Sequence, residues 1–441
     1  MRRLSLVAVF VACFCEAGLS GCASDDAGRA APVKVTSCTP ASLDGTRFAE
    51  ERRACMFSAG ATVEETLGID RTAASSIPIT HVIVRMQENR SYDHYLGQLP
   101  LRGQPEAEAV PEGFTNPDLS GAEVRPFPLA STCLEADPPH QWDANRAQWN
   151  EGALDGFVRT AAVDGSDGHY VMGYYDEPDL PFLYWAARTF ALGDRYFAAS
   201  LGGTWSNRNF LYTGSAHGVK NTFDRVISDA RTVFDQLDEA GVAWGVYTDG
   251  WLQPRQDTLG WTGDTPGVYP FSTLIERLRD GTLEPVVFVD TAPGSPNDEH
   301  PPYDVQTSDR WTRLMYEEAR RSPLWPSLAL FLNFDNGGGM FDHVPPPEAC
   351  VPAVGEEDFD QYGMRVPFIV ISPWAKRAHV SHDVNSHTSV LRFIQLLHDL
   401  PALTDRDANA DALLSMFEFA CPPPFSESPT PPPGGSGGCP R

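Results

Sequence analysis

Residues 327–347 read SLALFLNFDNGGGMFDHVPPP, and this stretch decides the class of fold. An apolar run of strand length ends at Asp335 and Asn336, and three glycines, 337–339, follow directly. Runs that are apolar on both faces are typical of strands buried inside a parallel sheet. We therefore expect Asp335 and Asn336 to lie at the carboxyl end of a buried strand, next to a loop that glycine makes conformationally free.

The rest of the chain repeats this pattern of buried strands alternating with amphipathic helices. The expected strands are 78–86, 242–248, 285–290, 327–335 and 366–372, and the expected helices are 180–192, 231–241, 271–281, 308–322 and 387–400. Such alternation predicts an α/β fold of three layers, with a mostly parallel central sheet covered by helices on both faces.

Polar side chains follow two of the expected strands. Glu88 and Asn89 come after 78–86, and Asp335 and Asn336 stand at the end of 327–335. Ligands of open α/β sheets bind at the carboxyl ends of the strands. Carboxylate and amide oxygens there suit a divalent cation such as Mg, Ca or Mn. The alternative is that these residues cap helices and form turns, as acidic residues at strand ends commonly do.

Composition and charge narrow the function. The chain has 441 residues, is 42% hydrophobic and carries a formal net charge of -26, which suits a globular protein with a large core. So acidic a chain is a poor partner for nucleic acid, whose phosphates need Lys and Arg patches. An anionic substrate would also need a local positive element, such as a metal ion, to offset this charge.

The N-terminus has the features of an export signal. A basic MRR and an apolar LSLVAVFVACF precede LSGC, which ends at Cys22, so 1–22 resembles a lipoprotein signal with Cys22 as the lipidated residue. We expect an exported, lipid-anchored protein of the bacterial cell envelope, in the periplasm or at the outer membrane. A plain secretory signal is the alternative.

The remaining boundaries follow from composition. Residues 23–77 are expected to form a tether and N-terminal segment, 78–420 the main domain, and 421–441 a Pro/Gly/Ser-rich tail. Six cysteines remain after Cys22, an even number that indicates disulfides in an exported protein. Short loops favour Cys38 with Cys55 and Cys421 with Cys439, which leaves Cys133 with Cys350.

A candidate nucleophile stands in SLGGTWSNRNFLYTGS (200–215). Gly202 and Gly203 allow close approach of a ligand, and Thr204 follows in an expected exposed turn before a helix. Ser206 is the nearest rival. The alternative for either hydroxyl is an ordinary cap of a helix.

Three histidines join the candidates. His140 follows two prolines and His300 precedes two, and proline restricts the backbone and so can hold a histidine in one place. Each could equally be a surface histidine in a loop. His387 starts a helix and is expected to cap it or to support the site.

Several motifs now occur in one order. They are QENRSYDHYLG (87–97), DPPHQW with WNEGALDGF (137–157), GGTWSNR (202–208), DEHPP (298–302), FDNGGGMFDHVPPP (334–347) and RVPFIVISPWA with HTSVLRFIQ (365–395). Together they resemble the bacterial phosphoesterase family of phospholipases C and acid phosphatases, over roughly residues 78 to 400. The resemblance implies an alkaline-phosphatase-like α/β/α fold and a hydrolase of phosphoric mono- or diesters.

The resemblance also implies roles by position. Glu88, Asn89 and Asp335 match the family's metal ligands, and Thr204 matches its nucleophile, bound to the same single divalent ion (Mg, Ca, Mn or Zn). His140 and His300 match histidines that contact the phosphoryl group. Asp342 and His343 are expected beside the site, or as residues that fix the loop before Pro345.

One departure from the family pattern concerns Asn336, where the family usually has an acidic residue. The expected substrate is a phosphate ester, either a small molecule or a phospholipid head group. Absence of the C-terminal domains of the larger phospholipases mildly favours the phosphatase-like members. The rival hypothesis is a surface lipoprotein on a degenerate scaffold that binds ligand without turnover, and Asn336 is its main support.

Overall fold

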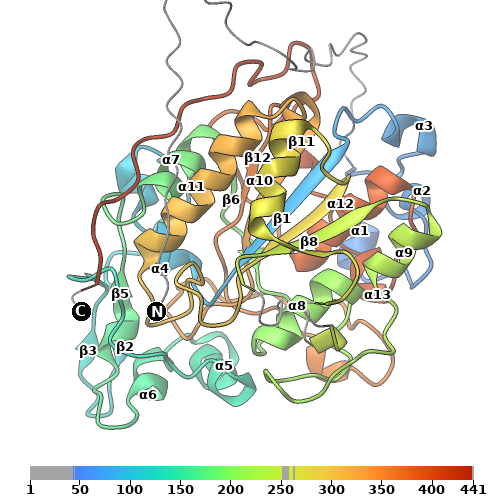
Figure 1. Cartoon of the computed structure of the whole chain (residues 1–441). Helices are drawn as coiled ribbons and strands as arrows, with labels where there is room; N and C mark the ends of the chain where they lie inside the picture. The colour runs from blue at the N-terminus through green and yellow to red at the C-terminus, as the bar shows by residue number, and fades with distance from the viewer. Residues whose placement is uncertain (1–42, 44, 251–257, 262–263, 440–441) are drawn as a thin grey trace, which may run out of the picture. The chain divides into compact units, whose positions relative to one another are not determined.

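Eight strands form one central sheet, in the order β13-β6-β12-β11-β1-β10-β8-β9. We describe it from a computed structural model that covers residues 43, 45–250, 258–261 and 264–439 (Figure 1). The strands, in that order, are β13 (His379–Ser381), β6 (Ala191–Gly193), β12 (Ile369–Ile371), β11 (Leu328–Phe334), β1 (His81–Gln87), β10 (Val286–Asp290), β8 (Trp244–Thr248) and β9 (Val268–Pro270).

The sheet is mostly parallel. β12 runs antiparallel to both of its neighbours, β11 and β6, and the other five pairings are parallel. β11 and β10 are buried over their full length and β1 over all but its first residue, because helices cover both faces of the sheet. The predicted fold class is therefore confirmed.

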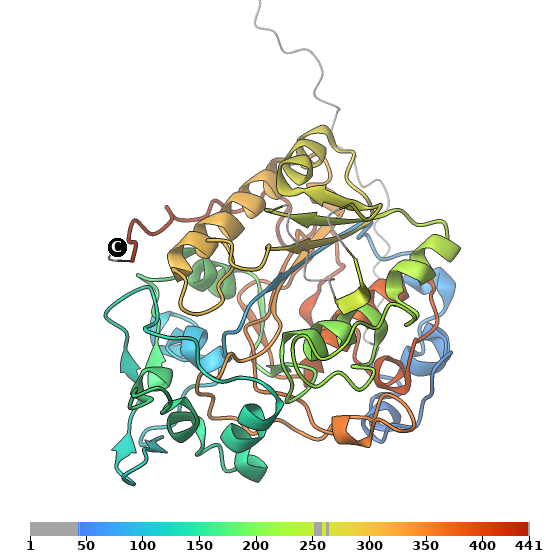
Figure 2. The same ribbon diagram turned by 60° about the horizontal axis from the view of Figure 1, so that its bottom comes forward.

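Two groups of helices lie on opposite faces of the sheet (Figures 1 and 2). One group contains α7 (Pro181–Thr189), α10 (Phe271–Asp280) and α11 (Val305–Arg321), and the other contains α8 (Thr204–Thr213), α9 (Val233–Glu239), α12 (His387–His398) and α13 (Asp405–Ala408). The three layers follow directly from the alternation in the sequence.

Shorter elements surround these layers. They are α1 (Ala49–Arg53), α2 (Val63–Leu67), α3 (Arg71–Ala74), α4 (Tyr92–Leu96), α5 (Trp142–Trp149), α6 (Phe157–Ala161), β2 (Asn116–Pro117), β3 (Glu123–Val124), β4 (Phe127–Pro128), β5 (Gly173–Tyr174), β7 (Tyr196–Phe197) and β14 (Asn385–Ser386).

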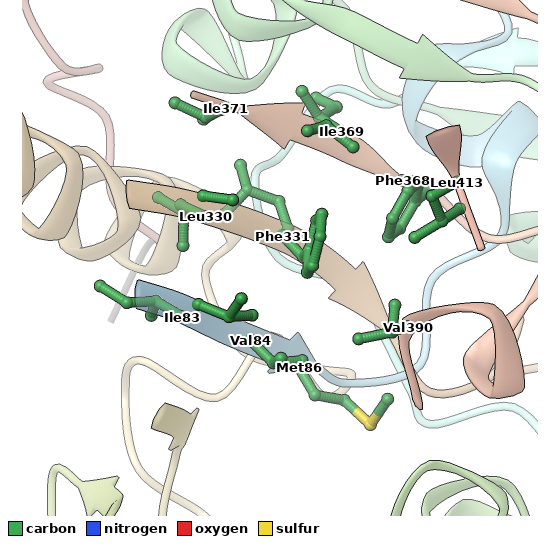
Figure 3. Packing of buried hydrophobic residues seen from close by; sticks show 14 of the residues in the cluster. Ile83, Val84, Met86, Leu330, Phe331, Phe368, Ile369, Ile371, Val390 and Leu413 are labelled. Carbon is green, nitrogen blue, oxygen red and sulfur yellow. The ribbon is translucent and has the colours of Figure 1, made fainter. Parts of the chain in front are cut away.

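The core fills the space between the sheet and its helices. Figure 3 shows Val84 and Met86 of β1, Phe331 of β11 and Val390 of α12 packed together, all at most 2% exposed. Burying each such side chain contributes about 1.5–3 kcal/mol to folding. This packing fixes β1 and β11 side by side and so sets the spacing of the residues that follow them.

Two local expectations were wrong. The helix expected over 180–192 ends at Thr189, because Ala191 begins β6 and pairs with β12 and β13. Thr204 is not in an exposed turn: it is the first residue of α8 and only 3% exposed. In both cases tertiary packing overrides the local pattern, since the sheet edge and the surrounding loops bury these residues.

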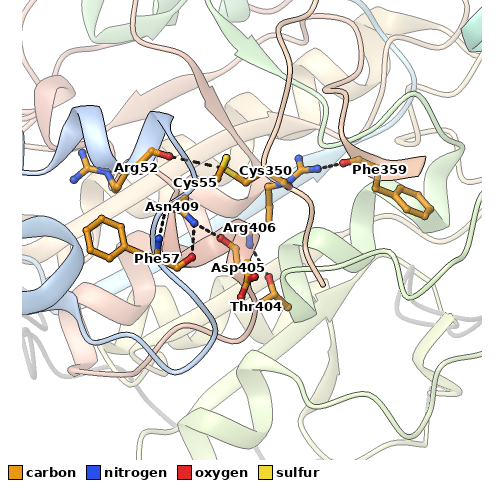
Figure 4. The surroundings of a disulfide bond; sticks show 9 residues. All are labelled: Arg52, Cys55, Phe57, Cys350, Phe359, Thr404, Asp405, Arg406 and Asn409. Carbon is orange, nitrogen blue, oxygen red and sulfur yellow. Dashed lines mark hydrogen bonds between the residues drawn. A yellow bond between two sulfur atoms is a disulfide. The ribbon is translucent and has the colours of Figure 1, made fainter. Parts of the chain in front are cut away.

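The predicted disulfide pairs were also wrong. The structure joins Cys55 to Cys350 and Cys133 to Cys439, with Cα–Cα distances of 5.5 and 5.7 Å. Cys421 is disulfide-bonded as well. Sequence proximity failed as a guide because the N-terminal segment folds back onto the region of α13. Figure 4 shows Asn409 there exchanging two hydrogen bonds with the backbone of Phe57 (3.1 and 2.7 Å).

The Pro-rich tail lies along α11. Arg313 donates to the carbonyl oxygen of Pro432 at 2.7 Å, Tyr316 to that of Pro429 at 2.7 Å, and Arg310 to that of Gly435 at 2.9 Å. Cys439 then ties the end of the tail to Cys133, seven residues before His140.

Some predictions concern residues that the structure does not describe. The predicted signal, 1–22, with its lipidation residue Cys22, lies outside the described residues, as does Cys38. Among the described helices, none has both the length and the apolar character needed to cross a membrane.

Candidate active site

Three neighbouring strands deliver carboxylates to one edge of the sheet. Glu88 follows β1, Asp335 follows β11 and Asp290 is the last residue of β10. Arg208 of α8 reaches all three: its Nη2 donates to Glu88 at 2.6 Å, its Nη1 to Asp290 at 2.5 Å and its Nε to Asp335 at 3.4 Å. Parallel strands end at the same edge, so the sheet itself gathers these charges.

This ion cluster is fully inside the protein. Arg208, Glu88 and Asp335 are 0% exposed. Burial alone would lower the pKa of Arg208, but the charges of Asp290, Glu88 and Asp335 outweigh it and raise the pKa well above its ordinary value. Three carboxylates and one guanidinium leave this set with an excess of negative charge.

Asn89, the second residue after β1, has an unusual backbone conformation. Asn89 has φ +58°, and its backbone N–H donates to Asp335 Oδ1 at 2.9 Å. Neither polar atom of its buried side chain has a hydrogen-bond partner among the described residues. An unpaired buried amide is costly, which makes the Asn89 side chain a candidate to bind a ligand of the site.

Asn336 and the glycine loop 337–339 complete the side of the site that contains Asn89. Asn336 Oδ1 accepts from the backbone N–H of Gly338 at 2.8 Å, which folds the loop back. A Cβ on Gly338, where φ is +61°, would lie 2.1 Å from the carbonyl oxygen of Asn89. Glycine is therefore required for the loop to pack against Asn89.

Thr204 stands at the start of α8, directly facing this cluster. Its Oγ1 lies 3.4 Å from Glu88 Oε2. Gly203 is the N-cap residue, so the unpaired backbone N–H groups of the first turn and the positive end of the helix dipole are near Thr204. The N-terminus of a helix favours anions, and phosphate in particular.

Ser206 forms a hydrogen bond with another serine. Its hydroxyl is fully buried and lies 2.8 Å from the hydroxyl of Ser200. The structure thus brings Thr204, and not Ser206, to the carboxylate cluster.

The two candidate histidines lie next to each other. The ring centroids of His140 and His300 are 5.5 Å apart, and Asp137 is 3.5 Å from His140 and 3.9 Å from His300. In each histidine Nδ1 lies 2.7 Å from a carbonyl oxygen, Pro138 for His140 and Pro301 for His300. A neutral ring donates there from Nδ1, which leaves the lone pair on Nε2.

The histidine pair is tied to the nucleophile and to the strand ends. Asn145 donates to the carbonyl oxygens of both His140 (2.7 Å) and Gly202 (3.1 Å). Glu299, which precedes His300, accepts from Gln87 at 2.5 Å and its carbonyl accepts from Arg90 at 2.9 Å. These bonds bring His140, His300, Thr204 and Glu88 into one site. Burial lowers the pKa of His140, and the neighbouring His300 lowers it further.

His387 contacts the backbone of Asp335. Its Nε2 lies 2.8 Å from the backbone carbonyl oxygen of Asp335, and it is the first residue of α12. Burial lowers the pKa of His387 to about 4, so the ring is neutral at pH 7 and donates to this carbonyl. It orients Asp335.

Asp342 and His343 belong to a different buried cluster. Arg365 donates to Asp342 at 2.9 Å and to Asp93 at 2.8 Å, and Asp93 is 2.6 Å from His343 Nδ1. Burial raises the pKa of Asp342 to about 6. Burial would lower the pKa of His343, but Asp93 outweighs it and raises the pKa. These bonds fix the loop that leads into the three prolines 345–347.

Several groups of residues could hold a metal ion. Asp137, His140 and His300 each offer a ligand atom within 4.8 Å of the others, as do Asp93, Asp342 and His343. Glu88, Asn89, Asp335 and Thr204 form the set that the sequence predicted.

Sequence reasoning missed Asp137, Arg208 and Asp290. Signals for them existed: Asp137 opens DPPH, Arg208 closes TWSNR and Asp290 ends a buried strand. Their meaning depended on which strands and loops become neighbours.

Comparisons with known proteins identify relatives of this chain. The sequence model of the phosphoesterase family matches residues 79–401. Phospholipase C B of Mycobacterium tuberculosis is 31% identical, over 84% of this chain and 83% of its own. Non-specific phospholipase C1 of Arabidopsis thaliana is 27% identical, over 78% of this chain and 71% of its own. A solved structure of a protein in the alkaline phosphatase superfamily from Vibrio parahaemolyticus has a TM-score of 0.44, at 12% identity, over 84% of this chain and 78% of that one.

The match spans β1 to α12 and therefore includes every strand and loop that contributes to the site. The prediction of a phosphoric ester hydrolase is confirmed by these matches. With the carboxylate cluster, Thr204 and the histidine pair all inside the matched region, the chain belongs to the phosphoesterase family.

Proposed function

We propose that this chain hydrolyses phosphoric esters through a covalent phosphothreonine on Thr204. The observation that carries the proposal is the position of Thr204 at the N-terminus of α8, 3.4 Å from Glu88. A phosphoryl group at that position meets backbone N–H donors and the helix dipole on one side. Ser206, which bonds Ser200, has no comparable position.

A divalent cation fits this group of residues. The buried side chain of Asn89 has no partner among the described residues, and the carboxylate set around Arg208 carries excess negative charge. Glu88, Asn89, Asp335 and Thr204 would hold the ion through hard oxygens, as Mg, Ca or Mn prefer, with Zn as a further possibility. When bound, the ion supplies a lowered pKa for a hydroxyl and positive charge beside the phosphate.

The chain's own residues perform the remaining steps. Glu88 Oε2 accepts the hydrogen of Thr204 Oγ1, and that oxygen attacks phosphorus in line with the leaving alcohol. The acid is His140 or His300 with both ring nitrogens protonated: its Nδ1–H stays bonded to the carbonyl, and its Nε2–H gives the proton to the leaving oxygen. The ring is then neutral with a lone pair on Nε2, and it accepts a proton from the water that displaces Thr204 in the second step, while Glu88 returns its hydrogen to Thr204 Oγ1.

Trapping the intermediate tests the nucleophile. Acid quenching during turnover of a phosphomonoester, followed by peptide mapping, should place phosphate on Thr204. Thr204→Ala should abolish trapping and lower the rate by several orders of magnitude, since loss of a nucleophile costs about a millionfold in other hydrolases. Thr204→Ser should retain activity. Ser206→Ala is the matched control and should stay within about tenfold of wild type. Phosphate on Ser206 or on a histidine would overturn the assignment.

Metal analysis tests the cation and its place. Exhaustive chelation should abolish turnover, and one of Mg, Ca, Mn or Zn should restore it. Glu88→Ala should lose the bound ion in elemental analysis, whereas Asp137→Ala should retain it. The reverse result would place the ion at the second group, Asp137 with His140 and His300. Full activity of a metal-free preparation would exclude a metal-dependent reaction.

The substrate class follows from a direct comparison. Relatives named phospholipase C support a diester such as a phospholipid, and we propose that the chain accepts a phosphate ester with this chemistry. Rates on matched chromogenic mono- and diesters would decide between phosphatase-like and phospholipase C-like activity. Binding of both without turnover of either would instead support the ligand-binding lipoprotein.

We also propose export and a lipid anchor through Cys22. The disulfides Cys55–Cys350 and Cys133–Cys439 support an oxidising compartment. Cys22→Ser should leave a protein that no longer partitions with membranes. Unchanged partitioning would refute the anchor.

A further inference from the structure

On the face of the sheet that α11 covers, one buried carboxylate joins the loop after β10 to both β1 and α4. Glu299 Oε1 accepts from Gln87, the last residue of β1, at 2.5 Å, and its Oε2 accepts from the hydroxyl of Tyr95 in α4 at 2.7 Å. Glu299 and Gln87 are 2% exposed and Tyr95 is 0% exposed. We call these three side chains the Glu299 cluster. The steps described above use none of them, although Glu299 directly precedes His300.

The Glu299 cluster lies across the sheet from the nucleophile. Gln87 Nε2 is 3.5 Å from the hydroxyl of Ser308 in α11, whereas the next residue, Glu88, binds Arg208 of α8 at 2.6 Å. α11 and α8 cover opposite faces of the sheet (Figures 1 and 2), and consecutive side chains of a strand point to opposite faces. The Glu299 carboxylate therefore touches no reacting atom, and any effect on the reaction passes through the residues that it holds.

The main chain around Glu299 is fixed as well. Its carbonyl oxygen accepts from Arg90 Nε at 2.9 Å. Asp298, the residue before it, accepts from the hydroxyl of Thr291 at 3.1 Å, close to the end of β10. Glu299 is thus held through both its side chain and its backbone, and His300 follows it directly.

The two histidines of the site are held by separate sets of bonds. Asn145 bonds the carbonyl oxygens of His140 and Gly202, at 2.7 and 3.1 Å, whereas Glu299 ties His300 to β1 and α4. Loss of the Glu299 cluster should therefore displace His300 while Asn145 keeps His140 in place. His300 is also the more exposed of the two side chains, 26% against 5%, and the leaving alcohol departs toward solvent.

The Glu299 carboxylate serves as the acceptor of two hydrogen bonds. Gln87 donates from Nε2 and Tyr95 from its hydroxyl, and Gln87 Oε1 has no hydrogen-bond partner among the residues that the structure describes. In Glu299→Gln, the new amide oxygen can accept from Tyr95. The new N–H group can donate to Gln87 Oε1 once the Gln87 amide turns over. The geometry of the cluster can thus survive loss of the charge.

We propose that Glu299 is a positioning residue for His300. By accepting from Gln87 and Tyr95, it fixes His300 at the distance from Glu88 at which the histidine protonates the leaving oxygen. The inference rests on the proposed function and deepens it, because it makes His300 the proton donor. Glu299 acts through these hydrogen bonds and transfers no proton itself.

Two aryl esters measure the position of the proton donor. The ratio of kcat on phenyl phosphate to kcat on p-nitrophenyl phosphate reports general acid catalysis, because the poorer leaving group, phenol, depends on it more. Glu299→Ala should lower this ratio by about 10–100-fold, with KM within about threefold of wild type, since the interaction lost acts in the transition state. Glu299→Gln should keep the ratio within about threefold of wild type, because an acceptor for Tyr95 remains.

A second variant covers the case in which Glu299→Ala fails to fold. Gln87→Met with Tyr95→Phe removes both donors, keeps the carboxylate and should lower the same ratio. Glu318→Ala is the matched control: Glu318 of α11 is a carboxylate only 9% exposed, and Arg279 of α10 donates to it at 2.7 and 2.8 Å. The control should keep the wild-type ratio, and circular dichroism would show that each variant is folded.

Histidine variants separate positioning from a general defect. In a His300→Ala background, Glu299→Ala should lower the ratio no further, because the group that it positions is gone. In a His140→Ala background, Glu299→Ala should lower the ratio as it does in wild type. Equal lowering in both backgrounds would show a general loss of structure and overturn the inference.

The inference and the proposed function fail in different ways. A wild-type ratio in Glu299→Ala or in His300→Ala overturns the positioning role and leaves the phosphothreonine on Thr204 intact. A ratio in Glu299→Gln as low as that in Glu299→Ala overturns it too, since the carboxylate would then act through its charge or its proton. If wild type with restored metal hydrolyses neither ester and no diester, the proposed function fails and the inference fails with it.

Discussion

Arg208 is the residue that makes the carboxylate cluster possible. Without it, Glu88, Asp290 and Asp335 would be like charges in the interior, which proteins avoid by protonation or by pairing. Its three bonds also fix the direction of each carboxylate. Removal of one partner from a buried ion pair costs about 3–5 kcal/mol, so Arg208 supports the site and the fold together.

Asn336 is the second informative residue, and we predict that Asn336→Glu changes the site without abolishing activity. The new carboxylate would add negative charge beside Asp335 and should tighten binding of a divalent cation by about tenfold, or ~1.4 kcal/mol. A metal titration and a pH–rate profile measure this. Asn336→Gln, which stays neutral, is the control. If the Glu variant matched wild type in both measurements, position 336 would lie outside the reacting group.

At the scale of elements, loops between strands position the histidines. The loop after β10 begins at Asp290, which binds Arg208, and ends at His300, so both of its ends lie in the site. Asp249 holds the middle of this loop from the end of β8. A side chain that touches none of the reacting groups can therefore control where His300 stands.

We predict that Asp249→Ala lowers kcat on phenyl phosphate by about 10–100-fold and on p-nitrophenyl phosphate far less. General acid catalysis contributes about 10²–10⁴-fold and matters most for a poor leaving group. The two substrates are close in size, so a general structural defect would lower both rates equally. Asp249→Asn, which keeps an acceptor, should recover part of the loss. Equal losses on both substrates would contradict a role through His300.

A buried aspartate lies where α7 packs against α11. Asp309 of α11 accepts from the backbone N–H groups of Phe182 (3.1 Å) and Leu183 (3.0 Å) at the start of α7. Burial raises the pKa of Asp309 to about 7 from an ordinary value of 3.8. The folded protein then binds this proton more tightly than the unfolded chain between about pH 4 and pH 7, so this group's contribution to stability falls as pH rises through that window.

We predict that Asp309→Asn removes this contribution. Urea unfolding measures the free energy of unfolding at pH 5 and at pH 7.5. The decrease in this free energy from pH 5 to pH 7.5 should be smaller in the variant than in wild type, by up to about 1.4 kcal/mol per pH unit in the window. Asp118→Asn is a control, because hydrogen bonds led by that of Ser120 lower the pKa of Asp118 to about 2, outside the measured range. Identical pH dependence in wild type and Asp309→Asn would refute the assignment.

At the scale of the whole molecule, two cross-links tie the flanking segments to the α/β domain. Cys55–Cys350 joins the N-terminal segment to the loop after the three prolines, across 295 residues of sequence. Arg406 of α13 donates to the backbone carbonyl of Cys350, so α13 is also bonded to the loop that carries this cross-link. Figure 4 shows the residues around it. The tail is hydrogen-bonded along α11, and its Cys439 is cross-linked to Cys133 by a disulfide.

We predict that Cys55→Ser with Cys350→Ser lowers the free energy of unfolding by about 2–5 kcal/mol, because a long loop is released in the unfolded chain. Denaturant unfolding measures this, and a reducing agent applied to wild type should give a loss at least as large, because it also opens Cys133–Cys439. Hydrolysis of a phosphoric ester at 25 °C should change little, since the cross-link contacts none of the site residues described above. A variant as stable as wild type would show that the hydrogen bonds of Asn409 and Arg406 suffice.

The sequence by itself determined the class of fold and most of the central strands. Val84 and Phe331 stand in runs apolar on both faces, and such runs are stable only between two layers of helices. Motif order also identified Glu88, Asn89, Asp335, Thr204, His140 and His300 as candidates. The inferences about fold and strands hold because periodicity and local residue type are properties of the chain, and the roles of these six residues stay predictions.

Tertiary structure decided what lies beside what. Arg208 and Asp290 join the site because α8 packs over the ends of β1 and β10, and Asp137 joins because its loop meets His300. The pairing of Cys55 with Cys350 reverses the guess from proximity for the same reason. Contacts between distant segments depend on how the layers pack, a collective free energy that no short stretch of sequence carries.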